Sequence, residues 1–264
     1  MTICIDNTPV EDHTRQFGLF VKREDLCCPP GPHFSKTRGV YPHIAKRPET
    51  LIGVLDTSHS QGGWAVAQAC KALGKQCVNF YPHYKHGTTD LKPQQQKAHQ
   101  LGAYMFTLPA GRSAVLYHQA KKQTTENGGY MMPNALKLPE TVSETAAELR
   151  RTRDRHKDLP PVMLISASSG TIAAGLASVW RGTLIVHMGY SRPETSVRKY
   201  IAEMAGTVTC EIVVVDEGYA YKDVAKAGAA PPWPCNAHYD KKAFRWWMAE
   251  GREKYQSAIM WNVG

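Results

Sequence analysis

Three short segments of the sequence carry residue types that could activate an amine and bind an anion. They lie at residues 21–26 with 33–38, at residues 57–63, and at residues 166–171. In the first segment, Lys36 stands two residues after the apolar Phe34 and two residues before the basic Arg38. A lysine becomes a Schiff-base nucleophile when it is partly desolvated or close to other cations, because both effects lower its pKa. Lys36 is therefore the candidate nucleophile, although a surface lysine at the start of a helix would have the same local sequence.

The third segment has the composition of a phosphate-binding turn. Ser168, Ser169, Gly170 and Thr171 follow an apolar run and open a helical pattern. Small residues at a helix N-terminus leave backbone N–H groups available to an anion, and the hydroxyl groups add further donors. No Gly-Lys-Ser/Thr follows, so the segment is not a P-loop, and it lacks the Gly-x-Gly-x-x-Gly spacing. It predicts a phosphate site, with an ordinary capped helix as the alternative.

Length and composition limit the class of protein. The 264 residues suffice for one large α/β unit or two small domains, and the hydrophobic content of 42% allows a packed core. No stretch approaches the roughly 20 apolar residues needed to cross a bilayer, and the first residues do not resemble a signal peptide. The seven cysteines form no Cys-x-x-Cys pair, which indicates reduced thiols in a cytoplasm. The eleven histidines show no metal-ligand spacing, so no metal centre is expected.

The chain is basic, with a net charge of +9. Excess positive charge raises the local concentration of anions, including phosphates and nucleic acid. The basic residues are dispersed, and the densest cluster, at residues 150–155, has the pattern of a solvated helix end. Charge alone therefore does not separate a nucleic-acid-binding protein from a generally basic surface.

From about residue 50 onward, apolar runs typical of strands alternate with helical patterns. The expected strands are 51–55, 77–81, 104–108, 129–132, 162–166, 184–188, 212–215 and 258–261. The expected helices are 64–73, 91–101, 113–123, 140–153, 171–180, 193–205 and 240–256. This alternation predicts parallel sheets covered on both faces, with ligands beyond the carboxyl ends of the strands. Residues 217–238 are irregular, and so long an irregular stretch in a compact domain is usually functional.

The order of the reactive segments resembles the fold-type-II enzymes that depend on pyridoxal 5′-phosphate (PLP). The similarity is greatest to the branch of D-cysteine desulfhydrase and aminocyclopropane-carboxylate (ACC) deaminase. There, Lys-Arg-Glu-Asp precedes Gly-Asn-Lys-x-Arg; here, Lys-Arg-Glu-Asp-Leu at residues 22–26 precedes Lys36-Thr37-Arg38, and residues 34–35 are Phe-Ser instead of Gly-Asn. Residues 132–134 and 261–264 are similar to family segments in the same order, so the resemblance covers almost the whole chain.

This resemblance implies a fold, a cofactor and an assembly. The family has two parallel-sheet α/β domains with PLP in the cleft between them, and it usually forms homodimers. The large PLP-binding domain is expected at residues 1–48 and 145–264, and the small α/β domain at residues 49–144. The lysine at the position of Lys36 holds PLP as a Schiff base in the family.

The resemblance also implies contacts for the rest of the cofactor. Residues 168–171 resemble the loop that binds the PLP phosphate. Ser60 and Gln61 stand where the family has Ser-Asn, whose amide bonds the phenolate oxygen of the cofactor. Gln61 can make that bond through a longer side chain, and Ser60 would assist at Cα or bind the substrate carboxylate.

Tyr239 and Asp240 stand where the deaminase branch has a Tyr-Glu pair. The carboxylate there contacts the pyridine nitrogen, which keeps the ring protonated and makes it a strong electron sink. Asp240 would take that part, with a helix N-cap as the alternative, and Tyr239 would pack on the ring. Tyr219 and Tyr221 resemble the loop that faces the substrate in this branch, and they are candidate acid/base groups.

The chemistry implied by the family is a Cα carbanion, delocalised as a quinonoid, on an amino-acid group, with Lys36 as the base. The chain also resembles compact phage-encoded PLP enzymes of DNA hypermodification, which would work in the host cytoplasm. The favoured substrate is therefore a glycine-modified thymidine, rearranged from a nitrogen-linked to a carbon-linked form.

The tryptophans bear on the choice of substrate. Trp233, Trp246 and Trp247, together with the positive charge, would suit nucleic acid or an unstacked base, although aromatic residues at helical spacing are usually core. Two other functions stay open. One is a lyase, deaminase or racemase for a small free amino acid, and the other is a non-catalytic PLP-fold protein or plain nucleic-acid binder.

Overall fold

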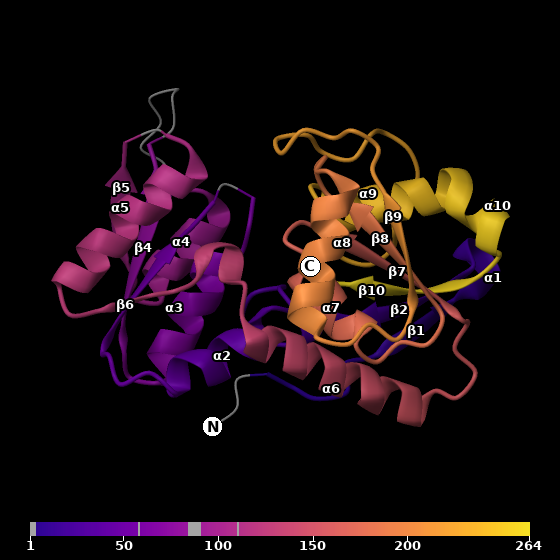
Figure 1. Ribbon diagram of the computed structural model, residues 1–264, viewed down its shortest axis with the longest axis horizontal. Helices are drawn as coiled ribbons and strands as arrows, with labels where there is room; N and C mark the ends of the chain where they lie inside the picture. The colour runs from indigo at the N-terminus through magenta and orange to yellow at the C-terminus, as the bar shows by residue number, and fades with distance from the viewer. Residues whose placement is uncertain (1–3, 58, 84–90, 110) are drawn as a thin grey trace. The chain divides into compact units, whose positions relative to one another are not determined.

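The computed structural model describes residues 4–57, 59–83, 91–109 and 111–264. It divides into two compact units, each with its own β-sheet (Figure 1). The first unit consists mainly of Cys28–Glu140, and the second of Ile5–Cys27 with Thr141–Gly264. Among the described residues, no helix is long and apolar enough to cross a membrane.

The first unit has a four-stranded sheet in the order β5-β4-β3-β6, and every pairing in it is parallel. Its strands are β3 (Leu51–Leu55), β4 (Gln76–Pro82), β5 (Tyr104–Leu108) and β6 (Tyr130–Met131). Its helices are α2 (Thr37–Ala45), α3 (Gly62–Ala72), α4 (Pro93–Gln100), α5 (Ser113–Glu126) and the short 3₁₀ turn η2 (Asn134–Leu136). The strands and helices expected between residues 51 and 132 are therefore confirmed.

Side-chain alternation explains why this sheet is covered on both faces. In β4, Cys77 packs with α2, α3 and α4, whereas Val78 and Phe80 pack with α5. Successive residues of a strand point to opposite faces, so an apolar run supplies both layers. The two hydrophobic clusters of the first unit lie on either side of one sheet.

The second unit has a six-stranded sheet in the order β1-β2-β10-β7-β8-β9. Its strands are β1 (Val10–His13), β2 (Leu19–Arg23), β7 (Val162–Ala167), β8 (Thr183–Met188), β9 (Glu211–Val215) and β10 (Ala258–Asn262). Its helices are α1 (Thr14–Phe17), η1 (Glu24–Leu26), α6 (Pro139–Arg155), α7 (Thr171–Ala177), α8 (Glu194–Ala205), α9 (Asp240–Trp246), the π-helical η3 (Trp247–Gly251) and α10 (Arg252–Tyr255).

One strand departs from the predicted parallel arrangement. β1 pairs with β2 in the antiparallel sense, whereas the other described strands of this sheet pair in parallel. The connection between β1 and β2 is the single turn of α1, and so short a link returns the chain antiparallel because a parallel crossover needs a dozen or more residues. The parallel sheets predicted from the alternation after residue 50 are confirmed, and this antiparallel strand lies before that region, at the edge of the sheet.

The three tryptophans expected near nucleic acid belong to the core of the second unit. Trp233, Trp246 and Trp247 are all buried, and Trp247 is fully enclosed with its ring N–H donating to the Phe17 carbonyl at 2.8 Å. Trp233 packs against the ring of Phe244 at a centroid distance of 5.5 Å. The idea that these rings hold an unstacked base is therefore wrong, because their faces are occupied by protein.

The division between the units lies elsewhere than at the expected boundaries. Residues 28–48 were expected in the large domain with the C-terminal half, whereas in the structure they lie in the first unit, within Cys28–Glu140. The reason is α2, whose Val40 and Ile44 are fully buried in a cluster with residues of α3 and the small sheet. An amphipathic helix joins whichever unit buries its apolar face.

Candidate active site

Lys36 belongs to the first unit and immediately precedes α2, and its side chain is buried. The residue is 7% exposed, and its Nζ donates to the Ala135 carbonyl oxygen at 2.6 Å. Ala135 has φ 57° and ψ 21°, a left-handed conformation that is costly for a residue with a side chain. Burial lowers the pKa of Lys36 to about 7, and the charge of Lys137 acts in the same direction. A large fraction of this amine is therefore neutral and nucleophilic near pH 7.

The start of α3 lies beside the same strained turn. A Cβ on Gly62 would stand 3.2 Å from Leu136 Cδ1 and 3.4 Å from Ser60 Oγ. The Gly62 N–H donates to Ser60 Oγ at 3.1 Å, and Gln61 Nε2 donates to the His33 carbonyl at 2.7 Å. Gln61 Oε1 is buried without a hydrogen-bond partner. The first unit thus places two of its predicted site residues, Ser60 and Gln61, at the start of one helix.

The predicted phosphate turn lies at the carboxyl end of β7 and the start of α7. Gly170 has φ +84°, a conformation that favours glycine, and this turns the chain into α7 at Thr171. Ser169 Oγ lies 3.0 Å from Thr171 Oγ1, so two hydroxyl groups stand together. The Ser168 carbonyl accepts from Arg192 Nη1 at 2.7 Å. The turn has the hydroxyl cluster expected of a phosphate site.

Two residues that hold this turn were missed in the sequence. Tyr200, in α8, places its hydroxyl 3.1 Å from Thr171 Oγ1 and its ring beside Gly170, where a Cβ would be 3.1 Å from Cδ1. Arg192 precedes α8 and binds the turn through its guanidinium. Neither has a local sequence signal, because both reach the turn only through the packing of α8 on α7.

Asp240 occupies the first turn of α9 and is fully buried in the second unit. Its Oδ1 accepts from the Val263 N–H at 3.1 Å, just beyond β10, whereas its Oδ2 is buried without a hydrogen-bond partner. Burial raises the pKa of Asp240 to about 7, the Val263 N–H lowers it, and the charge of Asp25 raises it. The N-cap position of α9 is Tyr239, so Asp240 does not cap that helix.

The predicted tyrosines gather beyond the carboxyl ends of β8 and β9. A Cβ on Gly189, which follows β8, would stand 2.6 Å from Tyr239 Cδ1, so only glycine allows this ring so close. Burial raises the pKa of Tyr239, as do the neighbouring Tyr221 and Tyr190. Tyr221 is exposed and packs edge-on against Tyr190 at 5.4 Å. Tyr239 therefore stays protonated near neutral pH and can donate a hydrogen bond.

Tyr219 is the buried member of this group. Its carbonyl accepts from the Ser191 N–H at 2.7 Å, which joins the loop after β9 to the loop after β8. The Nζ of Lys242 lies over the Tyr219 ring, 4.4 Å from its centroid. The second unit thus brings Asp240, Tyr219 and Tyr239 to one end of its sheet, where ligands of parallel sheets bind.

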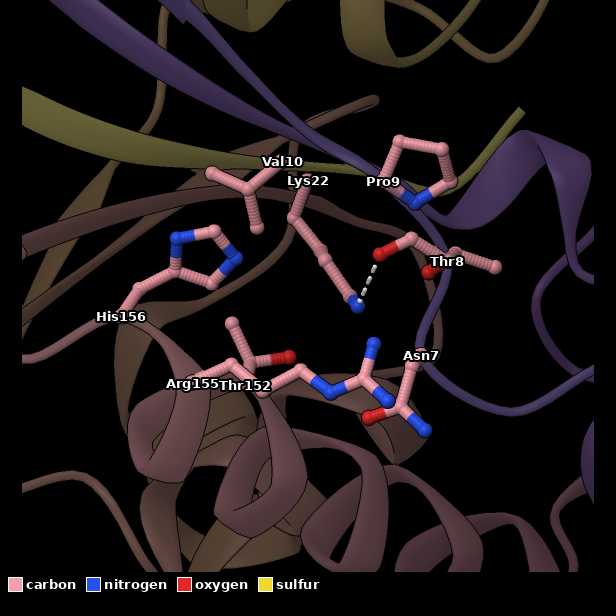
Figure 2. A pocket seen from close by; sticks show the side chains of 8 residues that line it. All are labelled: Asn7, Thr8, Pro9, Val10, Lys22, Thr152, Arg155 and His156. Carbon is pink, nitrogen blue, oxygen red and sulfur yellow. Dashed lines mark hydrogen bonds between the residues drawn. The ribbon is translucent and has the colours of Figure 1, made fainter.

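The Lys-Arg-Glu-Asp motif has a structural role in the second unit. Lys22 is enclosed, and its Nζ donates to the Thr8 carbonyl at 2.7 Å (Figure 2). The same Nζ also donates to Glu148. Arg23 forms a bidentate pair with Asp25 at 2.9 and 2.8 Å. The motif borders a cavity of about 240 Å³ that contains none of the predicted site residues and is lined by Asn7, Thr8, Pro9, Val10, Lys22, Thr152, Arg155 and His156.

A buried histidine was also missed. His187 is fully buried in β8, and its Nε2 lies 2.8 Å from Glu217 Oε2, which lowers the pKa of Glu217. Its Nδ1 is buried without a hydrogen-bond partner. A histidine in the otherwise apolar strand expected at residues 184–188 was the available signal.

One relative matches this chain along almost its whole length. The "Glycyl-dTMP PLP-dependent decarboxylase" of Pseudomonas phage M6 is 51% identical over 279 residues, which cover 99% of this chain and 100% of that protein. No model of a protein family matches the chain.

Solved structures share the fold at low sequence identity. A homologue of ACC deaminase superposes with a TM-score of 0.84 at 18% identity, covering 100% of this chain and 90% of that one. Threonine deaminase isoform 2 of Solanum lycopersicum gives 0.72 at 13% identity, with coverage of 99% and 85%. An L-serine ammonia-lyase of Rhizomucor miehei gives 0.69 at 14%, with coverage of 100% and 94%. The chain therefore belongs to the fold-type-II family of PLP-dependent enzymes, together with the phage M6 protein.

Proposed function

We propose that this chain is a PLP-dependent decarboxylase that acts on the glycine-derived group of a modified thymidine nucleotide. The observation that carries the proposal is the 51% identity, along the whole chain, to a phage protein named for that activity. The proposal keeps the substrate class inferred from the sequence, an amino-acid group on thymidine. It replaces the expected rearrangement by loss of the carboxylate.

The residues of this chain fit the cofactor. Asp240 Oδ2 is a buried carboxylate oxygen without a hydrogen-bond partner, which suits a protonated pyridine nitrogen. Ser169 and Thr171 supply two adjacent hydroxyl groups for a phosphate. Lys36 supplies a buried amine with a lowered pKa for the aldehyde carbon. Gln61 would contact the phenolate oxygen, and Tyr239 would pack on the ring.

When bound, PLP supplies an electron sink for the pair left on Cα when a bond to that carbon breaks. In decarboxylation, the bond between Cα and the carboxylate breaks, CO₂ leaves, and one proton from solvent ends on Cα. Lys36 would deliver that proton from Nζ, since its pKa of about 7 lets it hold or release one near neutral pH. Asp240 would hold a proton at the ring nitrogen, and Ser60 would bind the substrate through its hydroxyl.

The test is to incubate PLP-loaded protein with glycyl-dTMP and to measure released CO₂ together with the mass of the nucleotide product. We expect one CO₂ per nucleotide. A product of unchanged mass would identify the rearrangement instead. Turnover of free D-cysteine, serine or ACC without turnover of glycyl-dTMP would identify an enzyme of free amino acids, and the proposal would be wrong.

A further inference from the structure

The second unit contains a buried lysine that the proposed chemistry does not use. Lys242 lies in the first turn of α9, two residues after Asp240, and is fully buried. Its Nζ donates to the Gly189 carbonyl and lies 4.4 Å from the centroid of the Tyr219 ring. Among the described residues, no carboxylate oxygen lies within ion-pair distance of this ammonium group.

The other fully buried lysine of this unit shows what is missing around Lys242. Lys22 donates to a backbone carbonyl as well, but it also forms an ion pair with the fully buried Glu148. A buried cation is costly unless an anion compensates it, and an aromatic face or a carbonyl dipole compensates only part of the charge. Around Lys242, Asp223 and Glu217 act at a distance without contacting it. The position is suited to an anion supplied by a ligand.

The surroundings of Lys242 assign that anion to the substrate. Gly189 follows β8, the neighbour of β7 in the sheet, so Lys242 is attached to the same edge as the phosphate turn after β7. The cofactor phosphate would be bound by the hydroxyl groups of Ser169 and Thr171 at that turn. Lys242 instead contacts Tyr219, in the loop proposed to face the substrate.

We propose that Lys242, supported by the ring of Tyr219, binds the phosphate of the substrate nucleotide. This inference rests on the proposed function and names the part of the substrate that is recognised. A cation on the substrate carboxylate would stabilise a charge that decarboxylation removes, and it would raise the barrier. The nucleotide phosphate keeps its charge throughout, so a cation there strengthens binding equally in the ground state and the transition state.

The test compares two substrates in two proteins. The substrates are glycyl-dTMP and the corresponding nucleoside without phosphate, and the proteins are the PLP-loaded wild type and Lys242→Met, which keeps the length of the side chain and removes its charge. We expect the wild type to prefer the nucleotide by about 10- to 100-fold in kcat/KM, the value of one charge-assisted contact. Lys242→Met should lose that preference through KM, with kcat and the nucleoside reaction within about twofold.

The matched control is Lys241→Met, which removes the same charge from the adjacent residue of α9. Lys241 is half-buried, and we expect this variant to keep the preference for the nucleotide. If Lys242→Met slows nucleotide and nucleoside equally, Lys242 acts at the reacting carbon or on the fold, and the inference is overturned. The same conclusion follows if the wild type turns over both substrates with equal kcat/KM.

A binding measurement separates this inference from the proposed function. Calorimetric titration of PLP-loaded protein with dTMP and with thymidine requires no turnover. We expect dTMP to bind the wild type about 10- to 100-fold more tightly than thymidine. If Lys242→Met fails to fold, Lys242→Arg replaces it in the measurement, and because this variant keeps the charge, it should retain most of the difference in affinity. Equal affinities in the wild type would overturn the inference. Absence of CO₂ release from either substrate would overturn the proposed function alone.

Discussion

Lys36 in the first unit and Asp240 in the second unit are both buried, and both have a pKa of about 7, reached from opposite sides. Burial lowers the pKa of the lysine and raises that of the aspartate, because in both cases it disfavours the charged form. Lys137 adds to the effect on Lys36, and Asp25 adds to the effect on Asp240. Each unit thus contains a predicted site residue that can exchange a proton near neutral pH.

Lys22 and Asp240 differ in whether their buried polar atoms have partners within the chain, and this difference distinguishes a structural motif from a candidate site. Lys22 is as deeply buried as Asp240, yet it has both a carbonyl and a carboxylate as partners. Asp240 keeps one oxygen without a partner. A buried charge that has its partners within the chain needs no ligand, whereas a buried polar atom without a partner calls for an explanation outside the protein chain. The motif that carried the family resemblance is of the first kind, and the proposed ring-nitrogen contact is of the second.

Replacing Lys36 should have the largest effect on activity. We expect Lys36→Ala to reduce CO₂ release by about 10³-fold or more, and to abolish the absorbance band of PLP bound covalently to protein. Lys46→Ala is the matched control, because Lys46 ends the same helix and its side chain is 68% exposed. Lys36→Ala with an unchanged absorbance band would assign the cofactor lysine elsewhere.

Replacing Asp240 should have a smaller effect on the rate of the same reaction. Asp240→Asn keeps the shape of the side chain but cannot hold the ring nitrogen protonated, and we expect kcat to fall about 10²-fold. PLP should still bind covalently, because Lys36 is unchanged, so the absorbance band should persist. Asp154→Asn, at a side chain 81% exposed, should leave kcat unchanged. A full rate in Asp240→Asn would remove Asp240 from the chemistry.

The opposite pKa shifts predict opposite dependences of stability on pH in PLP-free protein. The pKa of Asp240 is raised, so the native state binds more protons than the unfolded state between about pH 4 and 7, and this contribution to stability is lost as pH rises. The pKa of Lys36 is lowered, so the unfolded state binds more protons between about pH 7 and 10, and stability rises with pH.

Urea unfolding of three proteins measures these two contributions. As pH rises from 4 to 7, Asp240→Asn should lose less stability than the wild type. As pH rises from 7 to 10, Lys36→Met should gain less stability than the wild type. Each difference should be on the order of a few kcal/mol, since one pKa unit corresponds to about 1.4 kcal/mol. Asp56, whose pKa burial also raises to about 7, is present in all three proteins and cancels in the comparison. If the free energy of unfolding changed with pH in the same way in all three proteins, the opposite pKa shifts of Asp240 and Lys36 would be contradicted.

The smallest expected effect concerns the phosphate turn. Tyr200→Phe removes the hydroxyl that lies 3.1 Å from Thr171 Oγ1 and keeps the ring beside Gly170. We expect PLP affinity, measured by titration of PLP-free protein, to weaken about 2- to 10-fold, the value of one neutral hydrogen bond. Tyr255→Phe, in α10 of the same unit, is the control and should leave PLP affinity unchanged.

Much of the fold could be predicted because its strands are apolar runs bounded by turn residues. The eight expected strands were all found, from β3 to β10. The elements before residue 50 were missed for local reasons. β2 ends in two charged residues, of which Lys22 is made compatible with burial by the distant Glu148, and α2 contains Pro42 inside the helix. Tertiary pairing overrides local propensity at such positions.

By itself, the sequence determined the alternation of strands and helices and the serine-rich turn at residues 168–171, because these depend on residue type and short spacing. Lys36 was a candidate from its neighbours together with the family resemblance, and Asp240 was a candidate from that resemblance alone. The tertiary structure alone decided which charges are buried and which of them have partners. It enclosed Trp233, Trp246 and Trp247, paired Lys22 with Glu148, and buried Lys242 but not the adjacent Lys241. Burial and pairing depend on residues far apart in the chain, and these long-range contacts set the pKa of a group and its need for a ligand.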